Sequence, residues 1–144
     1  MTLTALSQQA HTDAVVAALE GAGLVVGRGV RNTEPDGSGD PLDPPCAVVH
    51  PLIGGRRYGV LDDWTRHADL DYQVTCVGAT QEACEIVRDQ VEEVMLAGIT
   101  VAGRLIDVVR IAFGSDGTRR DDDIGAPDLY FIATPRYRLV STPA

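Results

Sequence analysis

The chain has 144 residues, of which 44% are hydrophobic and 23% are charged, so residues 1–144 are expected to form one domain around one core. Its 21 acidic and 12 basic side chains give a formal net charge of −9, which disfavours binding to the phosphate backbone of a nucleic acid. The apolar runs are far shorter than a membrane span, and the first residues lack the pattern of a secretion signal. We therefore expect a soluble protein that is made in the cytoplasm.

Residues 7–20 predict the first helix, because Ser7 suits the N-cap position and a Gly-Ala-Gly sequence follows the helix formers. A short strand is expected at residues 24–30. Residues 31–45 then contain four prolines and two glycines, a composition that prevents regular structure. We expect a mobile loop there.

The second strand is expected at residues 46–53, and the third at residues 69–77, where polar and apolar residues alternate. The apolar positions of the third strand are Leu70, Tyr72, Val74 and Cys76. This alternation predicts a strand with one side in the core and the other side, which includes Asp71, in water.

Thr80 is expected to cap a second helix that ends at Gly98. Its apolar stripe consists of Ala83, Val87, Val91, Val94 and Met95. The opposite, acidic side consists of Glu82, Glu85, Asp89, Glu92 and Glu93. An acidic side of this kind stays in water or contacts a partner.

Residues 99–113 predict two short strands joined by a tight Ala-Gly turn, and residues 129–140 predict a closing strand. A second mobile loop is expected at residues 114–126. The order of elements predicts an α/β fold of the α+β type: a mixed, mostly antiparallel sheet of about five strands covered by two helices.

Residues that carry chemistry do not form a recognisable reactive group. The aspartates at 121–123 lack the spacing of a calcium loop. Cys46 and His50 lie about 13 Å apart if both belong to one strand, which is too far for direct proton transfer. His11 and Asp13 are expected to be solvated on different sides of the first helix. We therefore expect no catalytic, cofactor-binding or metal-binding residue, and no enzyme.

The three cysteines, Cys46, Cys76 and Cys84, are an odd number and lack zinc-finger or redox spacing. A disulfide framework or a structural zinc site is therefore not expected. The sequence instead predicts free, mostly buried thiols.

Aromatic and arginine side chains are the candidates for a protein interface. Tyr58 and Trp64 lie near Arg56 and Arg57, and these residue types are enriched in interfaces. A role in the core is an equal alternative for Trp64, and also for Tyr72.

Arg136 and Arg138 flank a tyrosine in the expected closing strand, so their guanidiniums share one side of the sheet. They are able to clamp carboxylates of a neighbouring subunit. Solvated charges at a sheet edge are the alternative.

Three segments together resemble the tail-terminator proteins of long-tailed phages, with phages of actinobacterial hosts looking most similar. They are PLIGGRRYGVLDD at 51–63, DLDYQVTCVGATQEACEIVRDQV at 69–91 and ATPRYRL at 133–139. In that family a proline-and-glycine segment precedes a similar strand, a helix follows at once, and a later strand ends near a PRY-like motif.

The resemblance implies a structural virion protein rather than an enzyme. Proteins of this family form a ring, usually a hexamer, at the head-proximal end of the tail tube, where they stop tube growth and bind the head connector. The implied partners are further copies of the chain, the tail tube protein and the connector or neck proteins. Genomic DNA would pass through the ring without specific binding.

Acidic side chains in the lumen would keep contact with DNA weak, and two sets are candidates. Asp69 and Asp71 belong to the third strand, whereas Glu82, Glu85 and Asp89 belong to the second helix. We favour the strand at this point. The alternative functions are a head-completion or neck protein, a small hydrolase and a ligand-binding α/β module.

Overall fold

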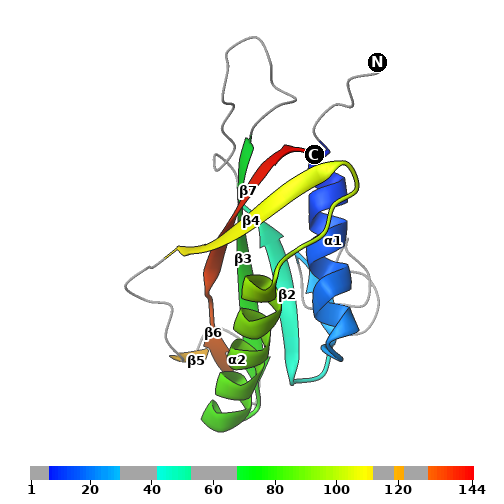
Figure 1. Ribbon diagram of the computed structural model, residues 1–144. Helices are drawn as coiled ribbons and strands as arrows, with labels where there is room; N and C mark the ends of the chain where they lie inside the picture. Colours follow the sequence, from blue (N-terminus) through cyan, green and yellow to red (C-terminus); the bar gives the residue numbers. More distant parts are fainter. Residues whose placement is uncertain (1–6, 30–41, 53–67, 112–118, 122–129) are drawn as a thin grey trace.

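The computed structural model describes residues 7–29, 42–52, 68–111, 119–121 and 130–144, with the backbone alone described at 119–121. In chain order the elements are α1 (Gln8–Gly21), β1 (Val26–Arg28), β2 (Cys46–Pro51), β3 (Ala68–Gly78), α2 (Gln81–Ala97), β4 (Arg104–Ile111), β5 (Arg119–Asp121), β6 (Tyr130–Ala133) and β7 (Arg136–Pro143). Figure 1 shows their arrangement. Neither described helix is long and apolar enough to span a membrane.

The described strands form one mixed sheet with β3 at its centre. On one side β3 pairs with β2, which pairs in parallel with β1. On the other side β3 pairs with β6 and β7, whose outer neighbours are β5 and β4. All pairs except β1–β2 are antiparallel, so the predicted α+β class with a mixed, mostly antiparallel sheet and two helices is confirmed. The sheet has more strands than we expected.

Both helices begin at side-chain caps that the sequence predicted. The Ser7 side chain accepts a hydrogen bond from the backbone N–H of Ala10 at 3.1 Å. The Thr80 side chain accepts one from Ala83 at the same distance of 3.1 Å. Each cap satisfies a donor that the first turn of a helix leaves without a partner.

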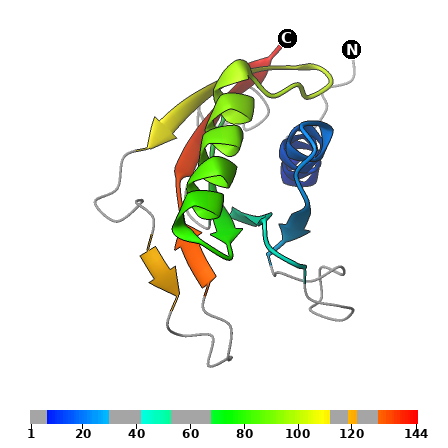
Figure 2. The same cartoon turned by 90° about the horizontal axis from the view of Figure 1, so that it is seen from below.

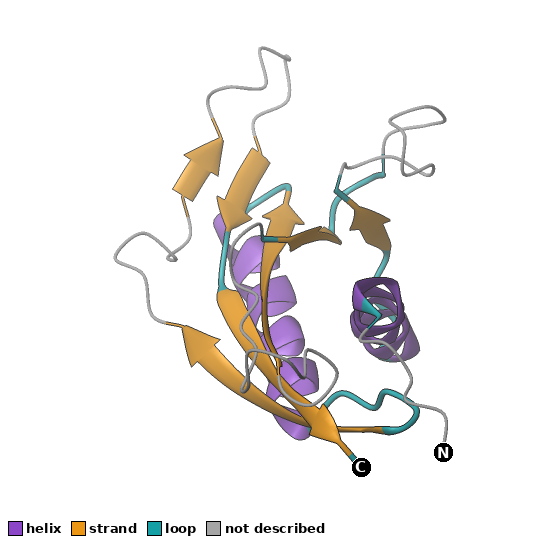
Figure 3. Cartoon of the chain, turned by 90° about the horizontal axis from the view of Figure 1, so that it is seen from above, coloured by secondary structure: helices purple, strands orange, loops and turns teal. Residues whose placement is uncertain are grey.

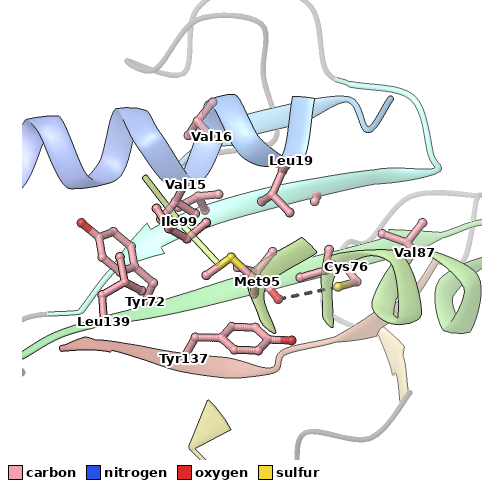
Figure 4. Close-up of a cluster of buried hydrophobic side chains, with 14 of the residues drawn as sticks. Val15, Val16, Leu19, Tyr72, Cys76, Val87, Met95, Ile99, Tyr137 and Leu139 are labelled. Carbon is pink, nitrogen blue, oxygen red and sulfur yellow. Dashed lines mark hydrogen bonds between the residues drawn. The ribbon is translucent and has the colours of Figure 1, made fainter. Parts of the chain in front are cut away.

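The core lies between the two helices and one face of the sheet (Figure 2). Val15 and Leu19 point from α1 towards the sheet, and Met95 points towards it from α2 (Figure 4). The sheet contributes alternate residues of β3 and β7, among them Tyr72 and Leu139, both buried. The strands β4 and β7 curve around α2 (Figure 3), and this curvature lets one layer of helices cover the sheet.

The single closing strand expected at residues 129–140 is wrong, because β6 and β7 are separate strands. Both keep the same register on β3, and the interruption falls at Thr134 and Pro135. Pro135 has no N–H to donate to a ladder, but its carbonyl still accepts from the N–H of Val74 at 3.0 Å. The proline therefore interrupts the ladder without changing the register.

The hairpin expected at residues 99–113 is also wrong. The tight turn is present, with Gly103 at φ 76° and the N–H of Arg104 bonded to the carbonyl of Val101 at 3.1 Å. Ile99 and Val101, however, enter the core from irregular backbone, and β4 pairs with β7 instead. Likewise β5 lies within the region that we expected to be one continuous loop.

Candidate functional site

One face of β3 and β7 points away from both helices, and we call it the polar face. It carries Asp69, Asp71, Gln73, Thr75, Arg136 and Arg138. The two arginines do share one face, as the sequence predicted. The alternation of the strands places these side chains in two facing rows.

The arginines of the polar face bond within their own chain. Arg138 lies opposite Asp71, and its guanidinium donates hydrogen bonds of 2.8 and 3.2 Å to the two carboxylate oxygens. This bonding to Asp71 raises the pKa of Arg138. Arg136 lies opposite Gln73 and donates to its Oε1 at 3.1 Å. A clamp on a neighbouring subunit stays a prediction, and it would have to share guanidiniums that already have partners.

The acidic face of α2, defined by Glu82, Glu85, Asp89 and Glu93, points away from the sheet, and all four residues are exposed. Glu92 does not belong to this face, contrary to our expectation. It is half-buried, and its Oε1 lies 3.1 Å from Nε of Arg110 on β4. The arginine of β4 thus draws one glutamate of the helix towards the sheet.

The two candidate sets of lumen acids therefore lie on opposite sides of the subunit. Asp69 and Asp71 belong to the polar face, whereas Glu82, Glu85 and Asp89 belong to the acidic face of α2. Asp71 is 13% exposed at its side chain and has a cationic partner. The surface of α2 consequently carries the denser negative charge.

Tyr72 belongs to the core, which decides between the two roles that the sequence left open. It is 0% exposed, and its hydroxyl lies 2.9 Å from Oγ1 of Thr12 on α1. Burial raises the pKa of Tyr72. The other interface candidates, Arg56, Arg57, Tyr58 and Trp64, lie outside the described residues.

His11 is buried, so our expectation of a solvated histidine is wrong. Its Nδ1 lies 2.6 Å from the carbonyl oxygen of Ser7, and its Nε2 lies 2.8 Å from Oγ of Ser141 on β7. The sequence carried a signal for this burial, since His11 precedes Val15 by one helical repeat and shares its face. Asp13 is solvent-accessible and pairs with Arg28.

The distance between His11 and Ser141 would suit a base and its nucleophile, but both side chains are buried and bonded to other parts of the fold. The contact therefore has a structural role. The carbonyl of Ser7 requires the hydrogen on Nδ1, so Nε2 accepts from the Ser141 hydroxyl. Arg104 donates to the same hydroxyl at 2.8 Å and to the Ser141 carbonyl at 3.0 Å. His11 and Ser141 are 1% and 0% exposed, and the contact joins α1, β4 and β7.

The prediction of free, buried thiols is confirmed for Cys46, Cys76 and Cys84. Burial raises the pKa of Cys76, so this thiol keeps its proton at neutral pH. The Cys84 thiol donates to the carbonyl of Cys76 at 3.4 Å. His50 lies on the same strand as Cys46, and burial lowers its pKa.

Metal ligands do not gather in the part of the chain whose side chains are described, where no three His, Cys, Asp or Glu residues are placed to share an ion. The aspartates at 121–123 have no described side chains.

The structure has two exposed apolar surfaces that we did not predict from the sequence. The first, which we call the β4 edge, consists of Leu105 and Val109, which are 62% and 52% exposed. The second, the α2–β1 groove, has a volume of about 470 Å³. The groove is lined by Gly23, Leu24, Val25, Asp43, Pro45, Ala83, Ile86, Val87 and Gln90.

Comparison with known proteins adds no relative, since no protein-family model matches the chain and no curated protein matches it significantly.

Proposed function

We propose that this chain is a structural virion protein that forms a ring at the head-proximal end of a phage tail tube. The ring ends tube growth and joins the tail to the head connector. Its partners are copies of itself, the tail tube protein and the connector or neck proteins, and DNA passes through it. It is assembled in the host cytoplasm and ends up in the virion.

The resemblance to tail terminators supports this proposal, and its described segments coincide with the centre of the fold. Residues 69–91 span most of β3 and the first part of α2, and residues 133–139 span the β6–β7 interruption. These segments supply the central strand, the helix packed on it and the arginines of the polar face. The similarity therefore concerns connected structural elements rather than scattered surface positions.

The observation that carries the proposal is the presence of two unlike exposed surfaces at the two edges of one sheet. A closed ring above a dimer needs such a pair, because each subunit contacts its neighbours through different surfaces. The β4 edge and the α2–β1 groove supply them. The buried His11 and Ser141, in contrast, are bonded to each other and to other parts of the fold, which is a structural role.

For the lumen we propose the acidic face of α2 rather than the strand that the sequence favoured. Phosphate groups that slide past a channel wall are held least by a wall of unneutralised carboxylates. Glu82, Glu85 and Asp89 form such a wall, whereas Asp71 is bonded to Arg138. The observed pairing thus favours the acidic face of α2 for this role.

Electron microscopy of the purified chain, alone and with assembled tail tubes, tests the proposed function. We expect rings that cap one tube end, and tubes of uncontrolled length when assembly proceeds without the chain. A subunit that stays monomeric at every concentration and never caps a tube would refute the proposal. Binding to the connector but not to tubes would point to a neck protein instead.

A further inference from the structure

A histidine that lies wholly inside the fold joins the start of α1 to the end of β7. His11 is 1% exposed, and its partner Ser141 is 0% exposed. The Nε2 atom of His11 lies 2.8 Å from Oγ of Ser141, and its Nδ1 atom lies 2.6 Å from the carbonyl oxygen of Ser7. Both nitrogens of the imidazole are therefore bonded to the fold.

The directions of these hydrogen bonds suit the neutral imidazole and not the protonated one. A carbonyl oxygen can only accept, so the ring hydrogen is on Nδ1, and Nε2 accepts from the Ser141 hydroxyl. The Ser141 oxygen in turn accepts from Nε of Arg104 at 2.8 Å. A proton on Nε2 would abolish the hydrogen bond from Ser141 and direct two cationic donors at one hydroxyl oxygen. The hydroxyl hydrogen would then lose the acceptor that it has now.

The position of His11 also disfavours a positive charge. Arg104 of β4 is a cation that already shares the Ser141 hydroxyl with His11. His11 belongs to the first turn of α1, where the positive end of the helix dipole opposes a cation. Burial adds to both effects, because an ion that leaves water loses its hydration. Proton uptake by His11 and the closed contact therefore oppose each other.

The other ionisable groups among the described residues do not supply a nearby negative charge. Asp13 of α1 is solvent-accessible and is paired with Arg28 of β1. Tyr72 of β3 is uncharged at neutral and acidic pH, since burial raises its pKa. The carboxylate of Ala144, after β7, belongs to an exposed residue and is screened by water and salt. The aspartates of β3 and β4 and the histidine of β2 point from the opposite face of the sheet, and the acidic face of α2 points away from it.

We propose that the His11–Ser141 contact is an acid-sensitive device, which holds the start of α1 on the sheet and releases it when His11 takes up a proton. The closed contact needs the neutral ring, whereas the open state places the imidazolium in water, so acid favours the open state. The contact is complete above about pH 6.5, the ordinary pKa of histidine, and weakens as the pH falls below that value. Val15 and Leu19 keep the rest of α1 on the core, so the release is confined to the first turn. The device does not depend on the proposed ring.

Amide hydrogen exchange of the purified chain at pH 7 and pH 5 tests the proposal, after correction for the intrinsic effect of pH on exchange. In the wild type, the amides at the start of α1 should lose protection by up to roughly 30-fold at pH 5, because an exposed imidazole is almost fully protonated there. The amides of α2 should keep their protection.

Two variants assign the effect to His11. His11→Gln keeps an acceptor for the Ser141 hydroxyl but takes up no proton, so its protection at the start of α1 should be equal at both pH values. His50→Gln is the matched control, since His50 is a half-buried histidine of β2 that points from the opposite face of the sheet. This control should show the same loss as the wild type.

The imidazole C–H signals of His11 in nuclear magnetic resonance spectra give a second measurement, which needs no variant. They should keep the positions of a neutral ring until the pH is well below 6.5, and an ordinary midpoint at or above 6.5 would overturn the proposal. Unchanged protection of the wild type at pH 5, or an equal loss in His11→Gln, would also overturn it. A loss that His50→Gln abolishes, or one that extends throughout the chain, would refute a local release through His11.

Discussion

Arg138 on β7 and Asp71 on β3 lie opposite each other on neighbouring strands, on the same face of the sheet, and are joined by two hydrogen bonds of 2.8 and 3.2 Å. The pair joins the outer half of the sheet to its central strand, on the face that no described helix covers. It also removes one carboxylate and one guanidinium from the set of charges that a partner could use. The same contact therefore bears on the stability of the fold and on which surface we propose for the lumen.

A double-mutant cycle on this pair should give a coupling free energy of about 0.5–1 kcal/mol, the upper range for a cross-strand ion pair in contact with solvent. The variants are Asp71→Asn, Arg138→Gln and their combination, with stability measured by urea unfolding. Molar salt should reduce the coupling by screening. The Asp13–Arg28 pair is the control, because its side chains are more exposed, at 48% and 40%, and should couple less. Equal coupling in both pairs would contradict this ranking.

Gly78 should be intolerant of any side chain, because β3 ends against the first turn of α2. A Cβ at this position would lie 2.3 Å from the backbone nitrogen of Cys84 and 2.8 Å from its Cα. Moving backbone atoms of α2 costs much free energy, so Gly78→Ala should destabilise the fold by about 1–3 kcal/mol or more. Urea unfolding measures the change.

The matched control for Gly78 is Gly21→Ala at the end of α1, where a Cβ would meet no atom within 4 Å. There we expect stabilisation of about 0.4–1 kcal/mol, since alanine restricts the unfolded chain. If both substitutions had the same effect, the close approach of β3 and α2 would not be the cause.

Ser141→Ala should destabilise the protein by about 1–3 kcal/mol, because it leaves the buried imidazole of His11 and the half-buried guanidinium of Arg104 without the shared hydroxyl. Ser141→Cys, which keeps a weak donor, should lose less. Thermal unfolding measures both, and Thr142→Ala next to it, at a half-buried position on the polar face, serves as the control. A loss no larger than that of the control would show that the hydroxyl is not the tie between α1, β4 and β7.

The local parts of this fold were predictable from the sequence. The alternation of residues 69–77 identified β3, and the caps at Ser7 and Thr80 identified the starts of both helices. Such signals are encoded within one or two turns of chain, where spacing alone fixes which side faces the core. The acidic face of α2 was visible for the same reason.

The pairing of distant segments was not predictable. The pattern of residues 99–113 suits a hairpin as well as a single strand, and only the ladder between β4 and β7 decides. Burial of His11 depends on Ser141, which lies 130 residues away in the chain. The β4 edge escaped notice because its exposure depends on where the sheet ends.

Stability should fall in alkaline solution because buried acidic groups resist ionisation. Burial raises the pKa of Cys76 above its ordinary value of 9.0 and the pKa values of Tyr72 and Tyr137 above 10.0. The folded protein therefore keeps protons that the unfolded chain releases. The stabilisation is fully present below pH 9 and declines as pH rises, by up to about 1.4 kcal/mol per pH unit for each group.

Cys76→Ala isolates the thiol's share of this decline. The tyrosines are the same in both proteins, so their contribution cancels in the comparison. Urea unfolding between pH 9 and 10 under reducing conditions should therefore show a shallower loss of stability in the variant than in the wild type. The absolute stability of the variant is lower at neutral pH, because the side chain is 0% exposed and its removal leaves a small cavity. The quantity to compare is therefore the slope of the free energy of unfolding against pH, and not its absolute value. Parallel pH profiles would mean that Cys76 ionises as easily in the folded protein as in the unfolded chain.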